Sequence, residues 1–377
     1  MAESQTLASS ELSIGRKNRS LWYRPEQEER LGCCICSDHR LCGGLRLDSD
    51  LFDCVMVCDC ANASTCSLVC PKNPEAFVGR IREINGFGFQ DITLSRAVGC
   101  PDLPSCVPLV YHRSRRTDSL DTDAIAVPLS RLFHGRSGLP HFTSKPALEK
   151  ALGFSANARL VITGVDHDQP LENYWANARR ASFVETLRSL NPSLVTTPNF
   201  SLFTDVPRWD NLYNMKRIAI CWYELAECGC PTALHVNART DRDWERWKEF
   251  LQAHREIAAV AFEFKTGGAS VERGRWHARK LAQLAMNLDR PMQLVVRGGL
   301  AYLPELREAF SKTVFVTADP FLKATKRRKL VWTLGAKPKW VRVLTLDGQP
   351  LDELLQHNVD TYRAMMTASG IIMKGLP

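Results

Sequence analysis

Residues 233–264 read ALHVNARTDRDWERWKEFLQAHREIAAVAFEF and hold two short apolar runs separated by a helical pattern. Ala233–Val236 and Val260–Phe264 have the length and apolar composition of buried strands. Asp241–His254, between them, places apolar side chains at the spacing of an amphipathic helix. Two strands joined by a crossover helix are typical of a parallel sheet.

The same alternation extends in both directions along the chain. Further apolar runs occupy Val107–Tyr111, Ala124–Leu129, Leu160–Val165, Leu194–Thr197, Leu294–Val296 and Val314–Thr317. Helical patterns occupy Leu171–Leu190, Trp209–Cys228, Glu272–Leu288, Tyr302–Phe310 and Pro320–Leu330. Eight strands alternating with helices predict an α/β fold, a (β/α)8-like barrel with some distortion allowed at its start. A doubly wound open sheet is the alternative, although no Gly-x-Gly-x-x-Gly follows any strand.

The composition is that of a globular protein. Of the 377 residues, 45% are hydrophobic and 24% are charged, which excludes fibrous, collagen-like and wholly disordered chains. No apolar stretch reaches the length of a membrane span, so no membrane partner is expected. The first residues lack a basic patch followed by an apolar segment, so we expect no secretory signal and a cytoplasmic location.

Cysteine is concentrated near the N-terminus, where nine of the 14 cysteines lie between Cys33 and Cys70. Disulfides do not persist in a reducing cytoplasm, so thiols at this density predict metal ligands. The candidate ligands are Cys33, Cys36, Cys42, Cys54, Cys58, Cys60, Cys66 and Cys70. Because the residues between them are small, polar or turn-forming, metal binding would supply the folding energy of this module.

Two kinds of metal centre fit these spacings. Structural zinc takes four ligands, and Cys33 and Cys36 with a nearby His or Cys resemble half of such a site. Iron–sulfur clusters take four thiolates, often in a run ending in Cys-Pro, as at Cys70. An iron–sulfur cluster is favoured because nine candidates exceed one tetrahedral site, and zinc is the alternative. Cys100 and Cys106 are either late ligands or ordinary loop residues, and the last three cysteines are predicted to pack in the core.

These patterns divide the chain into four parts. We expect a flexible tail over residues 1–29 and the Cys-rich metal-binding module over 30–75. The barrel-like domain is predicted to take residues 76–345, and residues 346–377 a C-terminal helical extension. The third part is long enough to bury a hydrophobic core of its own.

Polar side chains follow most of the apolar runs. In parallel sheets and barrels, active-site residues lie at these carboxyl ends of the strands. The candidates for a base or nucleophile are Asp166, Glu263 and Asp319. The candidates for substrate binding are Asn199, Asn237, Arg239, Lys265 and Arg297, because amide and guanidinium groups suit phosphate or the edge of a carbonyl. Each of these residues has a structural role as its alternative. Asp166-His167-Asp168 is either a metal site or an Asp-rich surface turn.

The segment from Lys323 to Arg342 is strongly basic. It carries eight Lys and Arg residues and no acidic residue, which equals the formal net charge of +8. The densest part consists of Lys326, Arg327, Arg328 and Lys329, and Trp332 and Trp340 are interleaved with the basic residues. Basic groups with aromatic neighbours favour contact with the phosphates and bases of a nucleic acid, DNA or RNA. The alternative is a solvated helix face followed by a loop.

One stretch resembles a known family. Thr197-Pro-Asn-Phe-Ser-Leu-Phe-Thr-Asp-Val-Pro207, followed by Asn211, Asn214 and Arg217, resembles a family of uncharacterised proteins from phages and mobile elements. In that family a Pro-Asp-Phe-Ser-Leu-Tyr strand end leads into a helix that bears Asn and Arg. The resemblance covers roughly residues 197–265. Asn199 stands here in place of the usual acid, which argues against a base at that position.

A looser resemblance concerns the combination of parts. A barrel with a Cys-rich metal element and a basic surface is similar to the tRNA-guanine transglycosylase superfamily, including its DNA-modifying branch. The resemblance implies base exchange by an Asp nucleophile at a strand end, which would be Asp319 or Asp166 here. In that superfamily the zinc cysteines follow the late strands, whereas these cysteines precede the barrel.

The sequence therefore predicts a metal-containing enzyme of a mobile element or phage-related system that acts on nucleic acid or a nucleotide. The resemblance implies a transferase that modifies or exchanges a base. A non-catalytic nucleic-acid-binding regulatory protein is one alternative. An iron–sulfur radical or redox enzyme is another, although Cys54-x3-Cys58-x-Cys60 is one residue short of the motif of radical S-adenosylmethionine enzymes.

Overall fold

The computed structural model describes residues 80, 83–93, 99–179, 183–203, 208–265, 271–344 and 348–374. The eight predicted metal ligands between Cys33 and Cys70 lie outside these residues. The chain forms two compact units. The larger unit takes residues 94–199, 221–236 and 251–377, and the smaller takes 1–93, 200–220 and 237–250.

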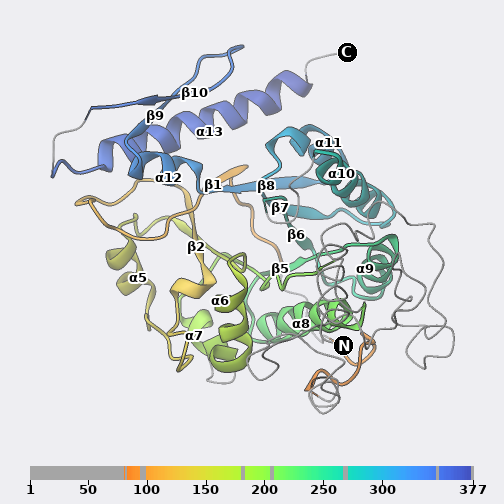
Figure 1. Ribbon diagram of the computed structural model, residues 1–377. Coiled ribbons are helices and arrows are strands. Elements are labelled where there is room, and N and C mark those ends of the chain that lie inside the picture. The colour runs from red at the N-terminus through yellow and green to blue at the C-terminus, as the bar shows by residue number, and fades with distance from the viewer. Residues whose placement is uncertain are drawn as a thin grey trace, which may run out of the picture. The chain divides into compact units, whose positions relative to one another are not determined.

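The larger unit is built around one sheet of eight parallel strands (Figure 1). The strands are β1 (Cys106–Pro108), β2 (Ala124–Pro128), β3 (Arg159–Thr163), β4 (Leu194–Thr196), β5 (Thr232–His235), β6 (Ala259–Glu263), β7 (Gln293–Arg297) and β8 (Lys312–Thr317). Their spatial order is β1-β8-β7-β6-β5-β4-β3-β2. A single parallel bridge between Leu109 and Ala126 joins the two edges, so the sheet is nearly closed into a barrel. The predicted (β/α)8-like architecture is confirmed at this level.

Small and branched apolar side chains fill the interior of the barrel. Every strand contributes at least one residue, and β2, β6 and β8 contribute two at alternate positions: Val107, Leu109, Ala124, Ala126, Val161, Leu194, Ala233, Ala259, Ala261, Val295, Val314 and Val316. Alanines predominate on β2, β5 and β6, whereas branched residues predominate on β1, β7 and β8. Residues of different size on facing strands fill such an interior without a channel.

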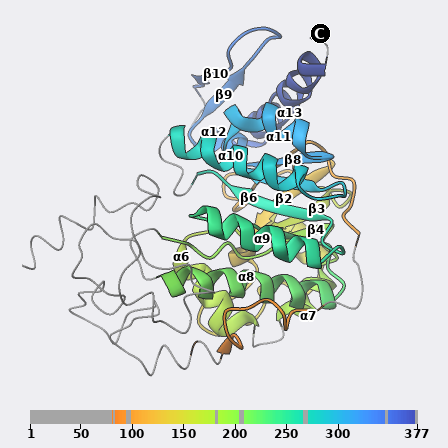
Figure 2. The same ribbon diagram turned by 90° about the vertical axis from the view of Figure 1, so that its right-hand side faces the viewer.

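Helices follow most of the strands. They are α5 (Lys145–Leu152), α6 (Asp168–Asn173), α7 (Phe183–Ser189), α8 (Arg208–Glu227), α9 (Asp241–Ala253), α10 (Val271–Met286), α11 (Leu303–Ala309), α12 (Asp319–Thr325) and α13 (Asp352–Lys374). Figure 1 shows α10 and α11 beside β7 and β8, and Figure 2 shows both helices near β8 from another side. The ring of Phe262 on β6 packs against His277 on α10, with 5.0 Å between ring centroids. Within the described ranges, no helix is both long and apolar enough to cross a bilayer.

The sequence-based helix over Pro320–Leu330 is wrong in its second half. The helix α12 ends at Thr325, Arg327 adopts a left-handed backbone with φ 53°, and Arg328–Val331 forms strand β9. This strand pairs antiparallel with β10 (Lys339–Arg342). The physical reason is that Leu330 is buried while its neighbours on β9 are exposed, and this alternation suits a strand better than a helix.

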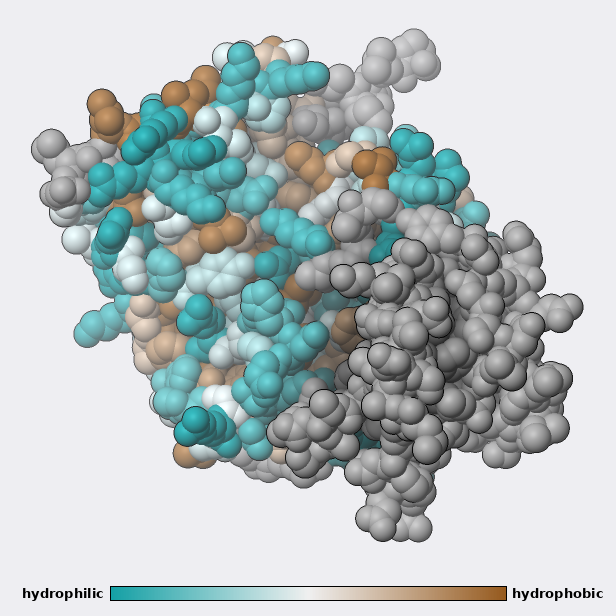
Figure 3. Space-filling model, in the orientation of Figure 1, coloured by the Kyte–Doolittle hydropathy of each residue, from teal (hydrophilic) through white to brown (hydrophobic). Residues whose placement is uncertain are grey.

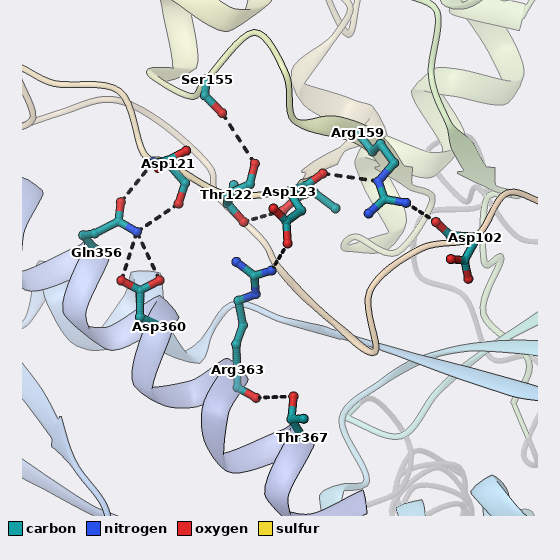
Figure 4. A network of polar contacts seen from close by, with 11 residues as sticks. Asp102, Asp121, Thr122, Asp123, Ser155, Arg159, Gln356, Asp360, Arg363 and Thr367 are labelled. Carbon is teal, nitrogen blue, oxygen red and sulfur yellow. Dashed lines mark hydrogen bonds and ion pairs between the residues drawn. The ribbon is translucent and has the colours of Figure 1, made fainter.

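The long C-terminal helix α13 is fixed to the barrel by polar contacts at the start of β2 (Figure 4). Gln356 accepts a hydrogen bond from the backbone N–H of Asp121 over 3.0 Å and donates to its carbonyl over 2.9 Å. About two helical turns further on, Arg363 pairs with Asp123. The helix also packs through its apolar residues, since Tyr362 is buried and its ring stacks on Phe315 of β8 with 6.5 Å between centroids.

The smaller unit contains an ion pair between a buried lysine and an exposed aspartate. Lys216 of α8 is fully buried and its Nζ contacts Asp91, which belongs to the segment 83–93. The ring of Phe89 in the same segment stacks on Trp247 of α9, with 5.4 Å between centroids. Because a buried ammonium is tolerated only with a partner, this pair fixes the segment to the helix.

Candidate functional site at the carboxyl ends of the barrel strands

The strand register places polar side chains of three neighbouring strands on the inner face of the barrel. His235 pairs with Ala261, and Ala261 belongs to the barrel interior. Glu263 and Arg297 pair with each other, each two residues beyond an interior position. Side chains two residues apart on a strand share a face. His235, Glu263 and Arg297 are therefore the last inward-facing residues of β5, β6 and β7.

Arg297 is held by groups from two other parts of the barrel. Its Nη1 donates to the carbonyl of Val165 over 3.0 Å, and its Nη2 donates to the hydroxyl of Tyr111 over 2.9 Å. Tyr111 follows β1, and its ring lies 5.8 Å from that of Phe321. The Nε of Arg297 is buried and has no hydrogen-bond partner among the described residues. The guanidinium is thus fixed in place, and its Nε–H is available to a further acceptor.

His235 is an uncharged imidazole beside this guanidinium. The residue is 2% exposed, its backbone N–H donates to Thr197 Oγ1 over 2.9 Å, and its Nδ1 lies 2.7 Å from the carbonyl of Thr197. Burial lowers the pKa of His235 to about 4, with a further lowering by the charge of Arg297 and an opposing effect of the Thr197 contact. A neutral imidazole facing a carbonyl carries its proton on Nδ1, which leaves the lone pair on Nε2.

Glu263 and Lys265 form the end of β6. One Glu263 oxygen accepts the backbone N–H of Lys265 over 2.6 Å, and the residue is buried. The Nζ of Lys265 lies 3.4 Å from an Asp319 carboxylate oxygen, with both side chains about two-fifths exposed (41% and 39%). Such an exposed pair contributes little to stability. The structure therefore brings the predicted residues Glu263, Lys265, Asp319 and Arg297 to one end of the barrel.

The glycine pair after β7 has a packing explanation. Gly298 and Gly299 both have positive φ, 75° and 68°. A Cβ on Gly298 would lie 2.8 Å from the Lys265 side chain, and one on Gly299 would lie 2.5 Å from the Phe264 ring. Only glycine allows this loop to pass so close to the end of β6.

Two further predicted residues follow β3 and β4. Asp166 accepts hydrogen bonds from Ser130 and, over 2.8 Å, from the backbone N–H of His167. Asn199 donates its backbone N–H to Gly164 over 2.8 Å, and its Oδ1 is buried without a partner among the described residues. Asp166 therefore shapes its own turn, while Asn199 offers an unused acceptor.

Asn237 and Arg239 belong to the smaller unit, where they hold the segment around residue 200. Asn237 Nδ2 donates to the carbonyl of Phe200 over 3.0 Å. Arg239 Nε donates to the carbonyl of Leu202 over 2.8 Å, and its Nη1 donates to Asn237 Oδ1 over 3.1 Å. These contacts give both side chains a bracing role. Substrate binding by them stays a prediction.

The described thiols have the properties of core residues. Cys106, Cys221 and Cys230 are buried, and Cys100 and Cys228 are partly buried. Burial raises the pKa of Cys106 to about 12 and those of Cys100 and Cys230 to about 11. A metal ligand must be a thiolate, so protonated thiols are poor ligands. Within the part of the chain that the structure describes, no three His, Cys, Asp or Glu side chains form a group suited to a metal ion.

The four predicted nucleic-acid residues lie at the end of α12 and the start of β9. Lys326 follows the last residue of α12, and Arg328 and Lys329 open β9. Lys326, Arg328 and Lys329 are exposed, and Arg327 is partly buried at its left-handed turn. The positive charge predicted from the sequence is therefore on the surface.

Two residues of the site, Tyr111 and His235, were not among the sequence-based candidates. Both lie inside apolar runs that predict strands. Their signal is the two-residue alternation: His235 is two positions beyond Ala233, and Tyr111 two beyond Leu109. A polar residue at one of the alternate strand positions that face the barrel interior marks the end of the apolar core.

No protein-family model matches the chain, and none of the curated proteins matches its sequence. The barrel alone does not indicate a reaction, because barrels of this kind support many unrelated chemistries. The side chains at the strand ends are therefore the basis for assigning a function. They offer a guanidinium for an anion, a neutral imidazole as acceptor and a carboxylate as base.

Proposed function

We propose that the chain is an enzyme that acts on a nucleic acid or a nucleotide, with its reaction site at the carboxyl ends of β5, β6 and β7. The observation that carries this proposal is that His235, Glu263 and Arg297 share the inner face of the barrel there. Active sites of (β/α)8 enzymes lie at this end. Buried polar groups disfavour folding unless they are paired, so an apolar interior would suit stability better than this set.

Each residue suits a different task in such a site. Arg297 would bind a phosphate or the carbonyl edge of a base through its unpaired Nε–H. Glu263 would act as general base, since its buried carboxylate is held at the end of β6 by the backbone N–H of Lys265. The transglycosylase resemblance would instead make Asp319 or Asp166 a nucleophile. The exposed basic residues around Arg328 support a polyanionic substrate.

The Cys-rich module completes the proposal. Its cysteines would hold an iron–sulfur cluster or zinc. Zinc would make the module structural or part of the substrate grip. An iron–sulfur cluster would favour the radical or redox alternative. A mobile-element or phage-related origin rests on the resemblance of residues 197–265.

A second candidate function is a non-catalytic nucleic-acid-binding regulator. The observation that favours it is the exposed basic hairpin of β9 and β10, which lies on the surface and not on the inner face of the barrel. This candidate predicts nucleic-acid binding without turnover. The substrate screen described next distinguishes the regulator from the enzyme.

The test is turnover of pooled DNA and RNA oligonucleotides and free nucleotides, followed by mass spectrometry of the products. Glu263→Gln and Arg297→Lys keep shape or charge, and each should lower turnover by about 100-fold or more. Glu308→Gln, at an exposed position of α11, is the matched control and should keep full turnover. Unchanged turnover in both site variants would contradict the proposal. Nucleic-acid binding with no turnover of any pool would favour the regulator.

A further inference from the structure

The hairpin of β9 and β10 has two chemically different faces. Its pairs are Lys329 with Val341 and Val331 with Lys339, which share one face. The alternate pairs, Leu330 with Trp340 and Arg328 with Arg342, share the other, because successive residues of a strand point to opposite sides. The first set, which we call the ribbon face, alternates lysine and valine on both strands.

The opposite face is anchored to the barrel unit. Leu330 is 1% exposed, and its backbone N–H donates to the Oδ1 of Asn358 on α13 over 2.8 Å. Asn358 is fully buried, and its Nδ2 donates to the carbonyl of Arg328 over 2.9 Å. The Nζ of Lys323 on α12 lies 5.7 Å from the ring centroid of Trp340. These contacts fix which side of the hairpin turns away from α13.

The ribbon face is exposed at all four positions. Lys329 and Lys339 are exposed, and Val331 and Val341 are 48% and 49% exposed. Figure 3 shows hydrophobic residues scattered among hydrophilic ones over the region where Figure 1 labels β9 and β10. No acidic residue lies between Lys323 and Arg342, so the hairpin complements a polyanion.

We propose that the ribbon face docks in the major groove of double-stranded DNA. The inference rests on the nucleic-acid part of the proposed function and narrows its substrate to a DNA duplex. The major groove of B-form DNA admits a two-stranded antiparallel ribbon. Lys329 and Lys339 would contact phosphates or guanine edges, and Val331 and Val341 would contact thymine methyl groups.

The same face is poorly suited to other nucleic acids. Single strands are bound by stacking bases on aromatic rings, and the ribbon face carries none, because Trp340 lies on the anchored side. An RNA duplex has a deep, narrow major groove that protein side chains cannot read. A DNA duplex is the polyanion whose groove matches both the width and the side chains of the ribbon.

The test is fluorescence anisotropy of the full-length chain with a DNA duplex of about 20 base pairs, the same sequence as a single strand, and the matching RNA duplex. We expect at least about tenfold tighter binding to the DNA duplex. The variant Lys329→Ala/Lys339→Ala should lose about tenfold or more in affinity and lower the salt slope by about two. The control Lys150→Ala/Arg279→Ala removes two exposed charges from α5 and α10 and should bind as the unmodified chain does.

A second variant distinguishes the contribution of the valines in the groove from that of the lysine charges. Val331→Ser/Val341→Ser keeps every charge, so it should weaken duplex binding while the salt slope stays unchanged. Equal affinity for all three nucleic acids would overturn the inference, as would unaltered binding by both ribbon variants. Ribbon-dependent binding to phosphatidylserine vesicles without a preference for duplex DNA would also overturn it. Turnover by the barrel site is a separate readout, so failure of the proposed reaction leaves this binding test intact.

Discussion

His235 makes the stability of the protein sensitive to acid. Burial first, and then the charge of Arg297, lowers its pKa from 6.5 to about 4 in the folded state. Above pH 6.5 the imidazole is neutral in both states, so folding stability does not depend on it. Between pH 6.5 and 4 the imidazole of His235 is protonated in the unfolded chain but not in the folded chain. The free energy of unfolding therefore decreases as the pH is lowered through this range. The loss between pH 7 and pH 5 should be about 2 kcal/mol.

The measurement is denaturant unfolding at pH 7 and pH 5 for the unmodified chain and for His235→Asn. The substitution should reduce the pH 5 loss by about that 2 kcal/mol. His167→Asn removes a histidine that is exposed in the folded protein and should leave the loss in place. An equal pH dependence in the unmodified chain and His235→Asn would show that the buried imidazole takes a proton in the folded state.

For single residues, the sequence identifies which polar side chains end the strands but not which groups they form hydrogen bonds with. Glu263 and Arg297 were predictable because each interrupts or ends an apolar run. Arg239 follows a strand in the same way, yet its guanidinium donates to the carbonyl of Leu202. A guanidinium binds a backbone carbonyl as readily as a substrate oxygen, so spacing alone cannot separate the two roles. Only the register shows that His235 faces the barrel interior.

Among the elements, the attachment of the hairpin to α13 depends on Asn358. Its side chain makes hydrogen bonds to the backbones of Leu330 and Arg328, and a longer one of 3.4 Å to the carbonyl of Pro320. Asn358→Ala would leave these groups buried without partners. We expect a loss of about 2–4 kcal/mol in the free energy of unfolding. Hydrogen exchange of β9 and β10 should become faster.

Hydrogen exchange read by mass spectrometry over residues 326–344 checks this expectation. Gln356→Ala, on the same helix, removes the contacts to Asp121 and should leave exchange in the hairpin unchanged. Hairpin exchange that is equally slow in Asn358→Ala would mean that the burial of Leu330 alone holds the ribbon in place.

The strands were easier to predict than the elements that follow them. Strands buried on both faces read as continuous apolar runs, and each of the eight predicted runs overlaps a strand of the sheet. The region after Asp319 fails this rule, because the hairpin is buried on one face only and its apolar residues are separated by basic ones. The turn at Arg327 carries no glycine or proline to mark it.

For the whole molecule, we expect the barrel and the Cys-rich segment to have different sources of stability. The barrel has its own apolar interior, so it needs no metal to fold. The segment from Cys33 to Cys70 has nine cysteines, and its other residues are mostly too small or polar to form a core. We therefore expect metal removal to affect that segment and to leave the cooperative unfolding of the barrel in place.

The decisive measurement is metal and acid-labile sulfide content, with an absorption spectrum, of full-length protein purified without oxygen. We expect on the order of one metal centre per chain, a brown iron–sulfur cluster being favoured over colourless zinc. Cys58→Ser should lower the metal content, whereas Cys221→Ser, at a buried position of α8, should keep it. After chelation the thermal unfolding of the barrel should persist, because the described core of the barrel is built from its own strands. Metal-free protein with intact thiols would contradict the prediction and leave the cysteines without a role in binding.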